Sequence, residues 1–356
     1  MVADKLCLPC LTSRYHVSTK NLTPAEHHPS SLPVAMRLLP LGVLAALLGH
    51  PAAALKIAAN LQWIEHTPLP YTNNNLYAAG PDRPVLADGG VVSLSDESDT
   101  IIGANSETQG LKQYATHKNY RLIYVLVEVT YRLVASRASG VHKLPDLKGK
   151  KIGTFNGTSA EVFVRALLSD AGLKGGDYTL VNTLVNGSMC MRAPCGPGTL
   201  PAMLKRREID AFGCWETAPE LAIEDMGEAE VSVFKNATLF REVFSLYATA
   251  EALGDTKKRA QIVRYIKSVN ETLELFKKAP NKVLPFVSKT INVPETVLGK
   301  VWKDHVWGPG SLGKDLIDFL EMEEKYLSRM DSRTAASRAD LEKFVDASVY
   351  EEALKL

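Results

Sequence analysis

The segment Asn156-Gly157-Thr158-Ser159 is the part of the sequence best suited to hold an anion. It follows an apolar run, its glycine allows the backbone to approach a ligand closely, and its hydroxyls stand at the expected start of a helix, where unpaired N–H groups favour phosphate or sulfonate. The spacing and the lysine of a Walker loop are missing, and no GxGxxG follows a strand. The residues therefore indicate a cradle for a small anion, with an ordinary helix cap as the alternative.

Two further segments combine an aromatic ring with an acid at the end of a predicted strand. Trp63, Glu65 and His66 can supply a stacking face, a hydrogen-bond acceptor and a titratable group. Trp215 and Glu216 repeat the aromatic-plus-acid arrangement further along the chain. We expect these five residues to contact a ligand, although Trp63 in an ordinary core and His66 on a surface loop remain alternatives.

A cation follows the predicted strand Leu122–Val129. Arg132 stands where a guanidinium can hold a carboxylate or a sulfonate through two hydrogen bonds. A salt bridge from Arg132 to Glu128 is the alternative.

Enzyme signatures are few. The sequence has no HExxH, no GxSxG and no histidine at a catalytic spacing from a serine or cysteine nucleophile. Three of the five cysteines lie after residue 54, and of these Cys190 and Cys195 are close enough to form a disulfide in an oxidising compartment, which leaves Cys214 without a partner among the three. No histidine or second cysteine pair lies near them, so we expect no metal site, no catalytic residue and no cofactor, and reversible binding is the simpler hypothesis.

Four strand-to-helix loops carry a serine or threonine where a helix should begin. Three of them also have Glu or Gln three residues later, the spacing of a capping box. The caps are Thr67, the pair Ser106 and Gln109, the pair Thr158 and Glu161, and the pair Thr217 and Glu220. Such loops lie at the carboxyl edge of a parallel sheet, so we expect all four to open onto one cleft that suits an anionic or strongly polar small molecule.

Composition limits the class of protein. The 356 residues include 41 Lys plus Arg and 40 Asp plus Glu, a net charge of +1, and 46% of the residues are hydrophobic. This balance argues against nucleic-acid or anionic-membrane binding driven by bulk charge, and the length suggests two domains.

Short apolar strands alternate with amphipathic helices from Leu55 onward, and after Ala250 only helices are expected. This order predicts an α/β fold with largely parallel sheets covered by helices. The predicted strands are 56–63, 91–94, 100–103, 122–129, 151–155, 178–184, 209–214 and 243–249. The predicted C-terminal helices are 256–278, 282–290, 295–305, 312–328 and 341–356.

The N-terminal region has the order of a secretory signal peptide. Met36-Arg37 is followed by the apolar run Leu38–Leu48 and by small residues up to Ala54. We therefore expect translation to start at Met36, residues 36–54 to form a signal peptide, and residues 1–35 to be an untranslated or disordered extension; a true start at Met1 is the alternative. The apolar run is too short to span a membrane, and the mature protein would be secreted or extracytoplasmic.

Two motifs resemble those of a known family. Leu144-Pro145-Asp146-Leu147-Lys148-Gly149-Lys150-Lys151-Ile152-Gly153, followed by Asn156-Gly157-Thr158, is similar to the second-domain entry of class II periplasmic-type solute-binding proteins. Met203-Leu204-Lys205-Arg206-Arg207-Glu208-Ile209-Asp210-Ala211-Phe212, running into Trp215-Glu216, resembles another element of the same family. The subgroup is the sulfonate/nitrate/taurine and thiamine-pyrimidine-synthase-like one, and the resemblance is strongest to fungal members without an attached transporter.

This resemblance implies two lobes with a ligand between them. Lobe 1 would comprise residues 55–135 plus 243–356 and lobe 2 residues 136–242, with a hinge near Ser136 and Arg241 and closure on the ligand. The positions carried over from the family are Trp63, His66, Asn105, Thr108, Gly157, Thr158, Trp215 and Glu216.

The family also has an enzyme branch that makes the thiamine pyrimidine from pyridoxal phosphate and a histidine. Its clustered cysteine motif is absent here, and no lysine adjoins Glu65-His66 to hold the aldehyde. We therefore expect non-catalytic binding of a small anionic or zwitterionic solute (sulfonate-, nitrate-, phosphate- or pyrimidine-like), with the enzyme as the alternative. A secreted scavenger that hands its ligand to a transporter or receptor of unknown identity is a third hypothesis.

Overall fold

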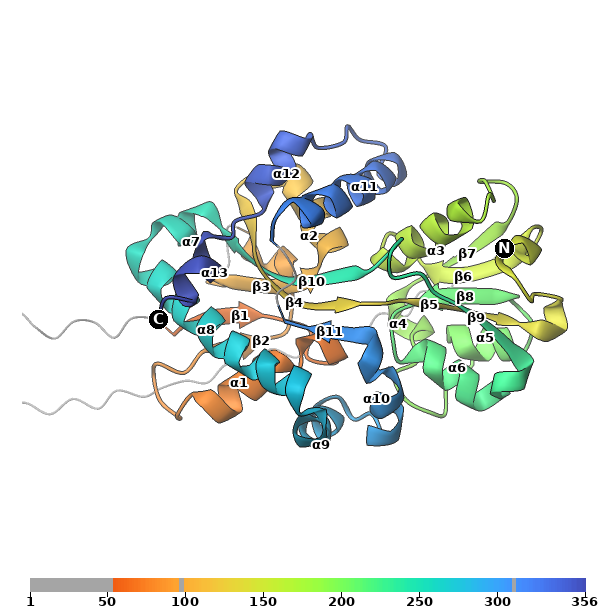
Figure 1. Ribbon diagram of the computed structural model, residues 1–356, viewed down its shortest axis with the longest axis horizontal. Helices are drawn as coiled ribbons and strands as arrows, with labels where there is room; N and C mark the ends of the chain where they lie inside the picture. The colour runs from red at the N-terminus through yellow and green to blue at the C-terminus, as the bar shows by residue number, and fades with distance from the viewer. Residues whose placement is uncertain (1–53, 96–98, 309–311) are drawn as a thin grey trace, which may run out of the picture. The chain divides into compact units, whose positions relative to one another are not determined.

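The computed structural model describes residues 54–95, 99–308 and 312–356 (Figure 1). The predicted extension 1–35 and all but the last residue of the predicted signal peptide 36–54 lie outside the described residues. Within the described part of the chain, no helix is both long and apolar enough to cross a membrane.

The first sheet has six strands in the order β11-β4-β10-β3-β1-β2. The strands are β1 (Lys56–Ala58), β2 (Val85–Ala87), β3 (Ile102–Ser106), β4 (Tyr120–Val129), β10 (Glu242–Thr249) and β11 (His305–Trp307). Strand β1 pairs in parallel with β2 and β3, whereas β10 runs antiparallel to β3 and β4, and β11 antiparallel to β4. We call this sheet and the helices packed on it lobe 1.

The second sheet has five strands in the order β7-β6-β8-β5-β9. The strands are β5 (Arg132–Ser136), β6 (Lys151–Phe155), β7 (Thr179–Thr183), β8 (Ala211–Cys214) and β9 (Val231–Phe234). Strand β6 pairs in parallel with β7 and β8, and β5 runs antiparallel to β8 and β9. This sheet and its helices form lobe 2, which lies beside lobe 1 in Figure 1.

Within the described residues, the chain crosses between the lobes twice. It passes from β4 to β5 through Thr130 and Tyr131, and it returns between the end of β9 at Phe234 and the start of β10 at Glu242. The first crossing thus lies a few residues before the expected position at Ser136. Strands β5 and β10 enter their sheets from the other lobe, and each runs antiparallel to a strand that precedes a helix. Both sheets are therefore mixed rather than largely parallel.

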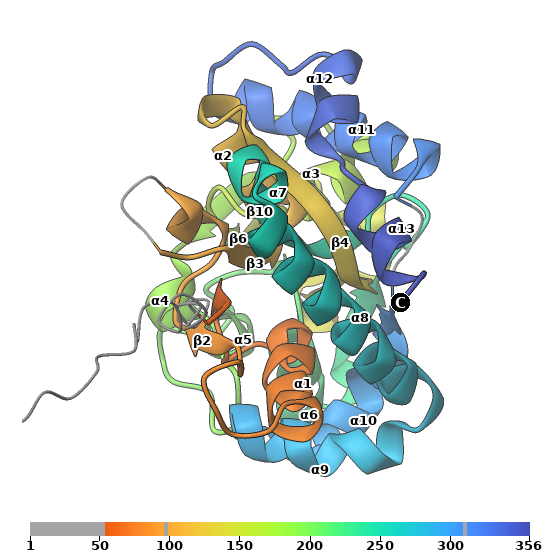
Figure 2. The same ribbon diagram turned by 90° about the vertical axis from the view of Figure 1, so that its left-hand side faces the viewer.

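Helices cover both sheets. They are α1 (Pro68–Leu76), α2 (Glu107–Thr116), α3 (Ser159–Asp170), α4 (Val185–Ser188), α5 (Leu200–Lys205), α6 (Ala218–Met226), α7 (Ala250–Gly254), α8 (Thr256–Lys278), α9 (Pro280–Ile291), α10 (Glu295–Val301), α11 (Lys314–Met330), α12 (Arg338–Phe344) and α13 (Ser348–Ala353). Figure 2 shows α8, the longest helix of the described residues, beside α1 and α13.

Four predicted elements are wrong. The predicted strand 56–63 ends at Ala58, because β1 pairs with its neighbours only over Lys56–Ala58, and the 3-10 helix η1 (Ile64–His66) begins soon after it. The predicted strand 91–94 is a 3-10 helix, η2, because Val91 and Leu94 are buried while Val92 is 58% exposed, which is the three-residue repeat of that helix. The predicted helix 295–305 is divided into α10 and the 3-10 helix η6 (Trp302–Asp304), and strand β11 begins at His305, so the C-terminal third is not wholly helical. The predicted helix 341–356 is divided into α12 and α13.

Candidate functional site

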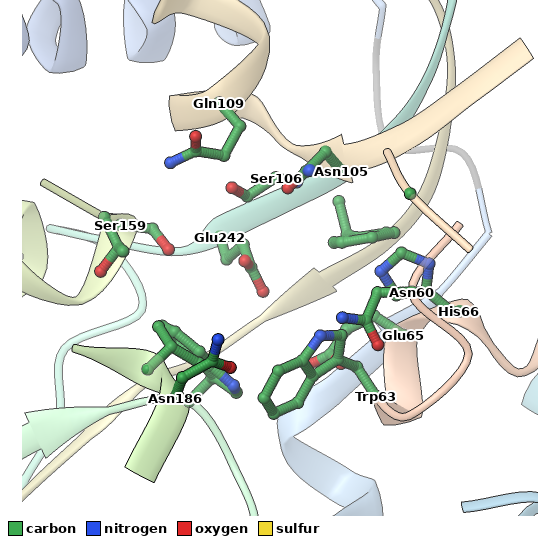
Figure 3. Close-up of a pocket in the computed structure, with 15 residues that line it drawn as sticks. Asn60, Trp63, Glu65, His66, Asn105, Ser106, Gln109, Ser159, Asn186 and Glu242 are labelled. Carbon is green, nitrogen blue, oxygen red and sulfur yellow. The ribbon is translucent and has the colours of Figure 1, made fainter. Parts of the chain in front are cut away.

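A pocket with a volume of about 390 Å³ lies between the lobes. We call it the interlobe pocket, and Figure 3 shows side chains from both lobes converging on it. Lobe 1 contributes Asn60, Trp63, Glu65, His66, Gly89, Asn105, Ser106, Gln109, Glu242 and Phe244, and lobe 2 contributes Thr158, Ser159, Val185, Asn186 and Trp215. Its volume lies in the range of small-molecule sites, about 300–1,000 Å³.

The four loops that precede α1, α2, α3 and α6 each contribute to this pocket, as predicted from their order in the sequence. Only one of the four caps works through its hydroxyl: Thr158 Oγ1 accepts a hydrogen bond from the Ala160 N–H at 3.2 Å. Thr67 Oγ1 instead donates to the Ile64 carbonyl at 2.7 Å, and Thr217 Oγ1 donates to the Met191 carbonyl at 2.9 Å. The helix starts are therefore as expected, but the predicted side-chain caps at Thr67 and Thr217 are wrong.

The predicted capping boxes also differ in detail. The Ser106 side chain makes no cap hydrogen bond, and Ser106 lines the pocket instead. The Glu161 carboxylate accepts from the Gly157 N–H at 2.8 Å rather than from the cap residue. Glu220 pairs with Arg132 at 2.9 Å.

Two tryptophans from different lobes meet at the pocket. The ring centroids of Trp63 and Trp215 are 5.6 Å apart, with an angle of 86° between the ring planes. Phe155 supports Trp215 at 5.0 Å, and Phe244 contacts His66 at 4.4 Å. These aromatic contacts fix the orientation of apolar surface on both sides of the cavity.

Two carboxyl groups line the pocket. Glu65 is 2% exposed and Glu242 is 5% exposed. Burial raises the pKa of Glu242 well above its usual range, the charges of Glu65 and Glu107 raise it further, and the neighbouring hydroxyls of Tyr131 and Ser159 oppose the rise.

A second layer of acids lies behind the lining. Glu107 and Glu323 are both fully buried, and burial with mutual repulsion raises the pKa of Glu107 well above its usual range. Burial also raises the pKa of Glu323, to about 7. Thr108 Oγ1 donates to Glu323 Oε1 at 2.8 Å, so this predicted ligand contact lies in the second layer and not in the lining.

The pKa values of the two histidines of the region are shifted in opposite directions. Burial lowers the pKa of His66 to about 3, so its imidazole is neutral. Burial also acts to lower the pKa of His305, but the Glu65 carboxylate, with Oε1 at 3.7 Å from His305 Nε2, raises it above its usual value. His305 Nδ1 lies 3.0 Å from the Val301 carbonyl.

Arg132, the cation expected to hold a ligand, is instead paired with two acids outside the pocket lining. Arg132 Nε lies 2.6 Å from Glu216 Oε1, and its Nη2 lies 2.9 Å from Glu220 Oε2. Burial raises the pKa of Glu216, although Arg132 opposes this. The alternative partner Glu128 pairs with Arg241 at 2.7 Å. Among the described residues, no lysine or arginine lines the interlobe pocket.

The glycine of the predicted cradle links the lobes. Gly157 has a φ of 68°, a left-handed conformation that favours glycine. Its carbonyl accepts from Lys112 Nζ at 3.0 Å and from Gln109 Nε2 at 3.5 Å, both on α2 of lobe 1. Asn156 is exposed, and its Oδ1 accepts from Asn182 Nδ2 at 3.1 Å.

The structure thus divides the predicted site residues into two groups. Those that line the pocket are Trp63, Glu65, His66, Asn105, Thr158, Ser159 and Trp215. Those outside the lining are Thr108, Arg132, Asn156, Gly157 and Glu216. Cys190 and Cys195 form a disulfide, and the described residues include no group of three or more His, Cys, Asp or Glu side chains placed to hold a metal ion.

Sequence reasoning missed eight lining residues. They are Asn60, Gly89, Ser106, Gln109, Val185, Asn186, Glu242 and Phe244. Ser106 and Gln109 belong to a predicted cap. Glu242 carries a weaker signal, since it is an acid that immediately precedes the apolar strand predicted at 243–249.

Among curated proteins, one of Brucella abortus (strain 2308) with the provisional description of a binding protein is 33% identical over 76 residues. The match covers 21% of this chain, and the chain spans 20% of the length of that relative. Proteins of Brucella suis and Brucella melitensis with the same provisional description match to the same extent.

Solved structures match over most of the described chain. The periplasmic aliphatic sulphonate binding protein SsuA from Escherichia coli has a TM-score of 0.66 at 17% identity, covering 83% of this chain and 92% of that one. A sulfonate-binding SsuA protein from Methylobacillus flagellatus has a TM-score of 0.65 at 15% identity, covering 85% and 94%. The desulfurization enzyme DSZB has a TM-score of 0.56 at 12% identity, covering 85% and 99%, so the same fold also occurs in an enzyme.

Similarity at these identities shows the fold and not the ligand. The chain has the α/β fold of the periplasmic sulfonate-binding proteins, and its residues 90–202 match the model of the family described as NMT1/THI5 like.

Proposed function

We propose that this protein binds one small polar solute reversibly in the interlobe pocket, without turnover. The observation that carries the proposal is the convergence of four helix-start loops from two lobes on one cavity, with a tryptophan on each side. The Brucella relatives are described provisionally as binding proteins, and two of the similar structures are sulfonate-binding proteins, which agrees with this role.

The lining suggests how a solute would be held. The starts of α2 and α3, with Ser106, Thr158 and Ser159, offer hydroxyls and unpaired N–H groups to the polar or anionic end of a ligand. Trp63 and Trp215 offer apolar faces to a flat or apolar part. An anionic or zwitterionic molecule with a flat or short apolar body fits this division.

The two crossings between the lobes would act as a hinge. Opening would separate α2 from the Gly157 carbonyl, which the Lys112 and Gln109 side chains contact in the structure. Ligand contacts to both lobes would then favour the closed arrangement.

Export is part of the proposal. The Cys190–Cys195 disulfide is of a kind that persists in oxidising compartments, in agreement with a signal peptide at residues 36–54 and a start at Met36. A role as a secreted scavenger that hands its ligand to a membrane partner would follow export. N-terminal sequencing of the native protein tests the start and the cleavage together.

The enzyme alternative fits the pocket poorly. No lysine stands in the described lining to hold the aldehyde of pyridoxal phosphate, although His66 lies there. If the enzyme hypothesis were correct, pyridoxal phosphate would be consumed with iron present, and His66 would be modified.

The test is a thermal-shift screen of the purified protein against sulfonates, phosphates, nitrate, amino acids, amines, pyrimidines and pyridoxal phosphate. A ligand at about 100 times its Kd adds about 2.7 kcal/mol to the free energy of unfolding, which corresponds to a rise of several degrees in Tm. Binding with unchanged ligand recovered afterwards supports the proposal. An unchanged Tm with every compound contradicts it.

A further inference from the structure

The charge of the interlobe pocket points to a narrower class of ligand than its shape does. Two carboxyl groups, Glu65 and Glu242, line the cavity, and no lysine or arginine does so among the described residues. In Figure 3 the Glu242 carboxylate projects into the space that the other labelled side chains surround. The acids Glu107 and Glu323 lie behind this lining.

The nearest arginines and lysine do not compensate Glu242, since each has its own partner, and the imidazole of His305 stands beside Glu65 instead. Arg132 pairs with Glu216 and Glu220, and Arg241 pairs with Glu128. Lys112, near the start of α3, lies 3.5 Å from Asp331 and donates to the Gly157 carbonyl.

Two lining side chains also have buried atoms without a hydrogen-bond partner among the described residues. They are Glu65 Oε1 and His66 Nδ1, each in a side chain that is 2% exposed. His305 Nε2 lies 3.7 Å from Glu65 Oε1, beyond hydrogen-bond length but within the range of an ion pair. Glu65 Oε1 can only accept a hydrogen bond, whereas His66 Nδ1 donates or accepts according to which ring nitrogen carries the proton, so both atoms are open to a polar group of a ligand.

We propose that the ligand carries a protonated nitrogen, as an ammonium, an amidinium or a protonated ring amine, and that the Glu242 carboxylate, with Glu65 beside it, binds that cation. This inference rests on the proposed function, because it names the charge of the solute for the same pocket. Trp63 lines the same pocket, and the face of its ring attracts positive charge. Any anionic group of a zwitterion would lie at the starts of α2 and α3.

The cation would change the protonation of its binding group. The titratable and charged groups around Glu242 are Glu65 and His66 before α1, Glu107 on α2, Tyr131 at the first crossing, Arg241 before β10, Tyr247 on β10, His305 on β11 beside Glu65, and Glu323 on α11. Burial, and then repulsion from Glu65 and Glu107, raises the pKa of Glu242 in the free protein. A cation bound there would favour the carboxylate form of Glu242, so the affinity would rise as the pH rises.

Three isosteric probes separate charge from shape: benzamidine is a cation, benzamide is neutral and benzoate is an anion. Isothermal titration of the full chain is expected to give at least about tenfold tighter binding of benzamidine than of benzamide, with benzoate the weakest. Glu242→Gln is expected to bring benzamidine and benzamide to within about threefold of each other. Glu224→Gln, which removes the same charge from α6 away from the pocket, is expected to leave the order unchanged.

The outcomes distinguish this inference from the proposed function. Tighter binding of benzoate than of benzamidine overturns the inference and leaves the proposed function standing. A preference for benzamidine that survives in both Glu242→Gln and Glu65→Gln has the same consequence. If none of the three probes binds but a compound from the thermal-shift screen does, the charge of that compound tests the inference. A compound with a protonated nitrogen supports it, and an anion without a cationic group overturns it. If nothing binds, the inference and the proposed function are both wrong. A thermal melt of each variant shows that it is folded before its affinity is compared.

Discussion

The buried acid Glu323 gives a prediction whose size follows from the structure. Its side chain is fully buried on α11 against the start of α2, and burial raises its pKa from the usual 4.5 to about 7. A tenfold change in an ionisation equilibrium corresponds to about 1.4 kcal/mol, so ionising Glu323 in the folded protein costs about 3 kcal/mol more than in the unfolded chain.

The effect on stability has a definite sign, because the pKa of Glu323 is higher in the folded protein than in the unfolded chain. Below pH 4.5 the carboxyl is protonated in both states and costs nothing, and as the pH rises to about 7 the unfolded chain ionises first. The contribution of Glu323 to the free energy of unfolding therefore falls across this window and stays low above it. Glu323→Gln removes the titration, and its amide oxygen can still accept from Thr108 Oγ1.

We expect Glu323→Gln to be more stable than the wild type by about 2 kcal/mol at pH 8, because the gain of about 3 kcal/mol is reduced by about 1 kcal/mol for an imperfect fit of the amide. We expect no gain in stability at pH 4.5. Urea unfolding at four pH values measures the difference. Glu321→Gln, on the same helix with a side chain 35% exposed, is the matched control and should change the stability by less than about 0.5 kcal/mol. A variant that is less stable than wild type at pH 8, or a gain that is the same at every pH, would refute the reasoning.

Three further substitutions test the pocket and its supports. Thr158→Val removes a hydroxyl that caps α3 and lines the pocket, so we expect weaker ligand binding and a loss of about 1 kcal/mol in the free energy of unfolding. Titration with ligand and urea unfolding measure the two effects, and an unchanged affinity would contradict the role of Thr158 in the pocket. Arg132→Met leaves the buried Glu216 without its cation, while Glu220 keeps Lys300, and we expect the free energy of unfolding to fall by about 3–5 kcal/mol. Urea unfolding measures this, and a variant as stable as the wild type would show that the pair of Arg132 and Glu216 is dispensable. Lys112→Ala removes a contact to the Gly157 carbonyl across the lobes, so we expect the lobes of the ligand-free variant to open more readily. Small-angle scattering should then give a larger radius of gyration than for the wild type, and an equal radius would contradict the hinge.

Elements with strong local signals could be predicted from the sequence. Strand β6 and helix α8 have the predicted bounds. Asp255 starts α8 by accepting from two backbone N–H groups, Lys257 and Lys258, which is the local chemistry that sequence patterns capture.

Elements that depend on distant partners could not be predicted. Strand β11 has only three residues inside an apparently helical region, and it exists because it pairs with β4. The same holds for β5 and β9, which pair with each other after the chain has entered the other lobe. Tertiary pairing decides such short strands, and no local pattern records it.

The site shows the same division. The loops at the helix starts could be placed in one cleft because parallel strands end at a common edge. Glu242 could not, since the antiparallel register of β10 on β3, with Phe244 opposite Ser106, is what brings it to the pocket. The sequence predicts that Arg132 faces a ligand, but acids 84 and 88 residues further along the chain hold it.

The central claim is that the interlobe pocket binds a solute and releases it unchanged. Isothermal titration of the full chain with the best compound of the screen, repeated with Trp215→Ala, tests it most directly, because Trp215 lines the pocket from lobe 2. We predict one ligand per chain, recovery of that ligand unchanged by mass spectrometry, and at least about tenfold weaker binding to the variant. Consumption of the ligand, or equal affinity of the two proteins, would contradict the account.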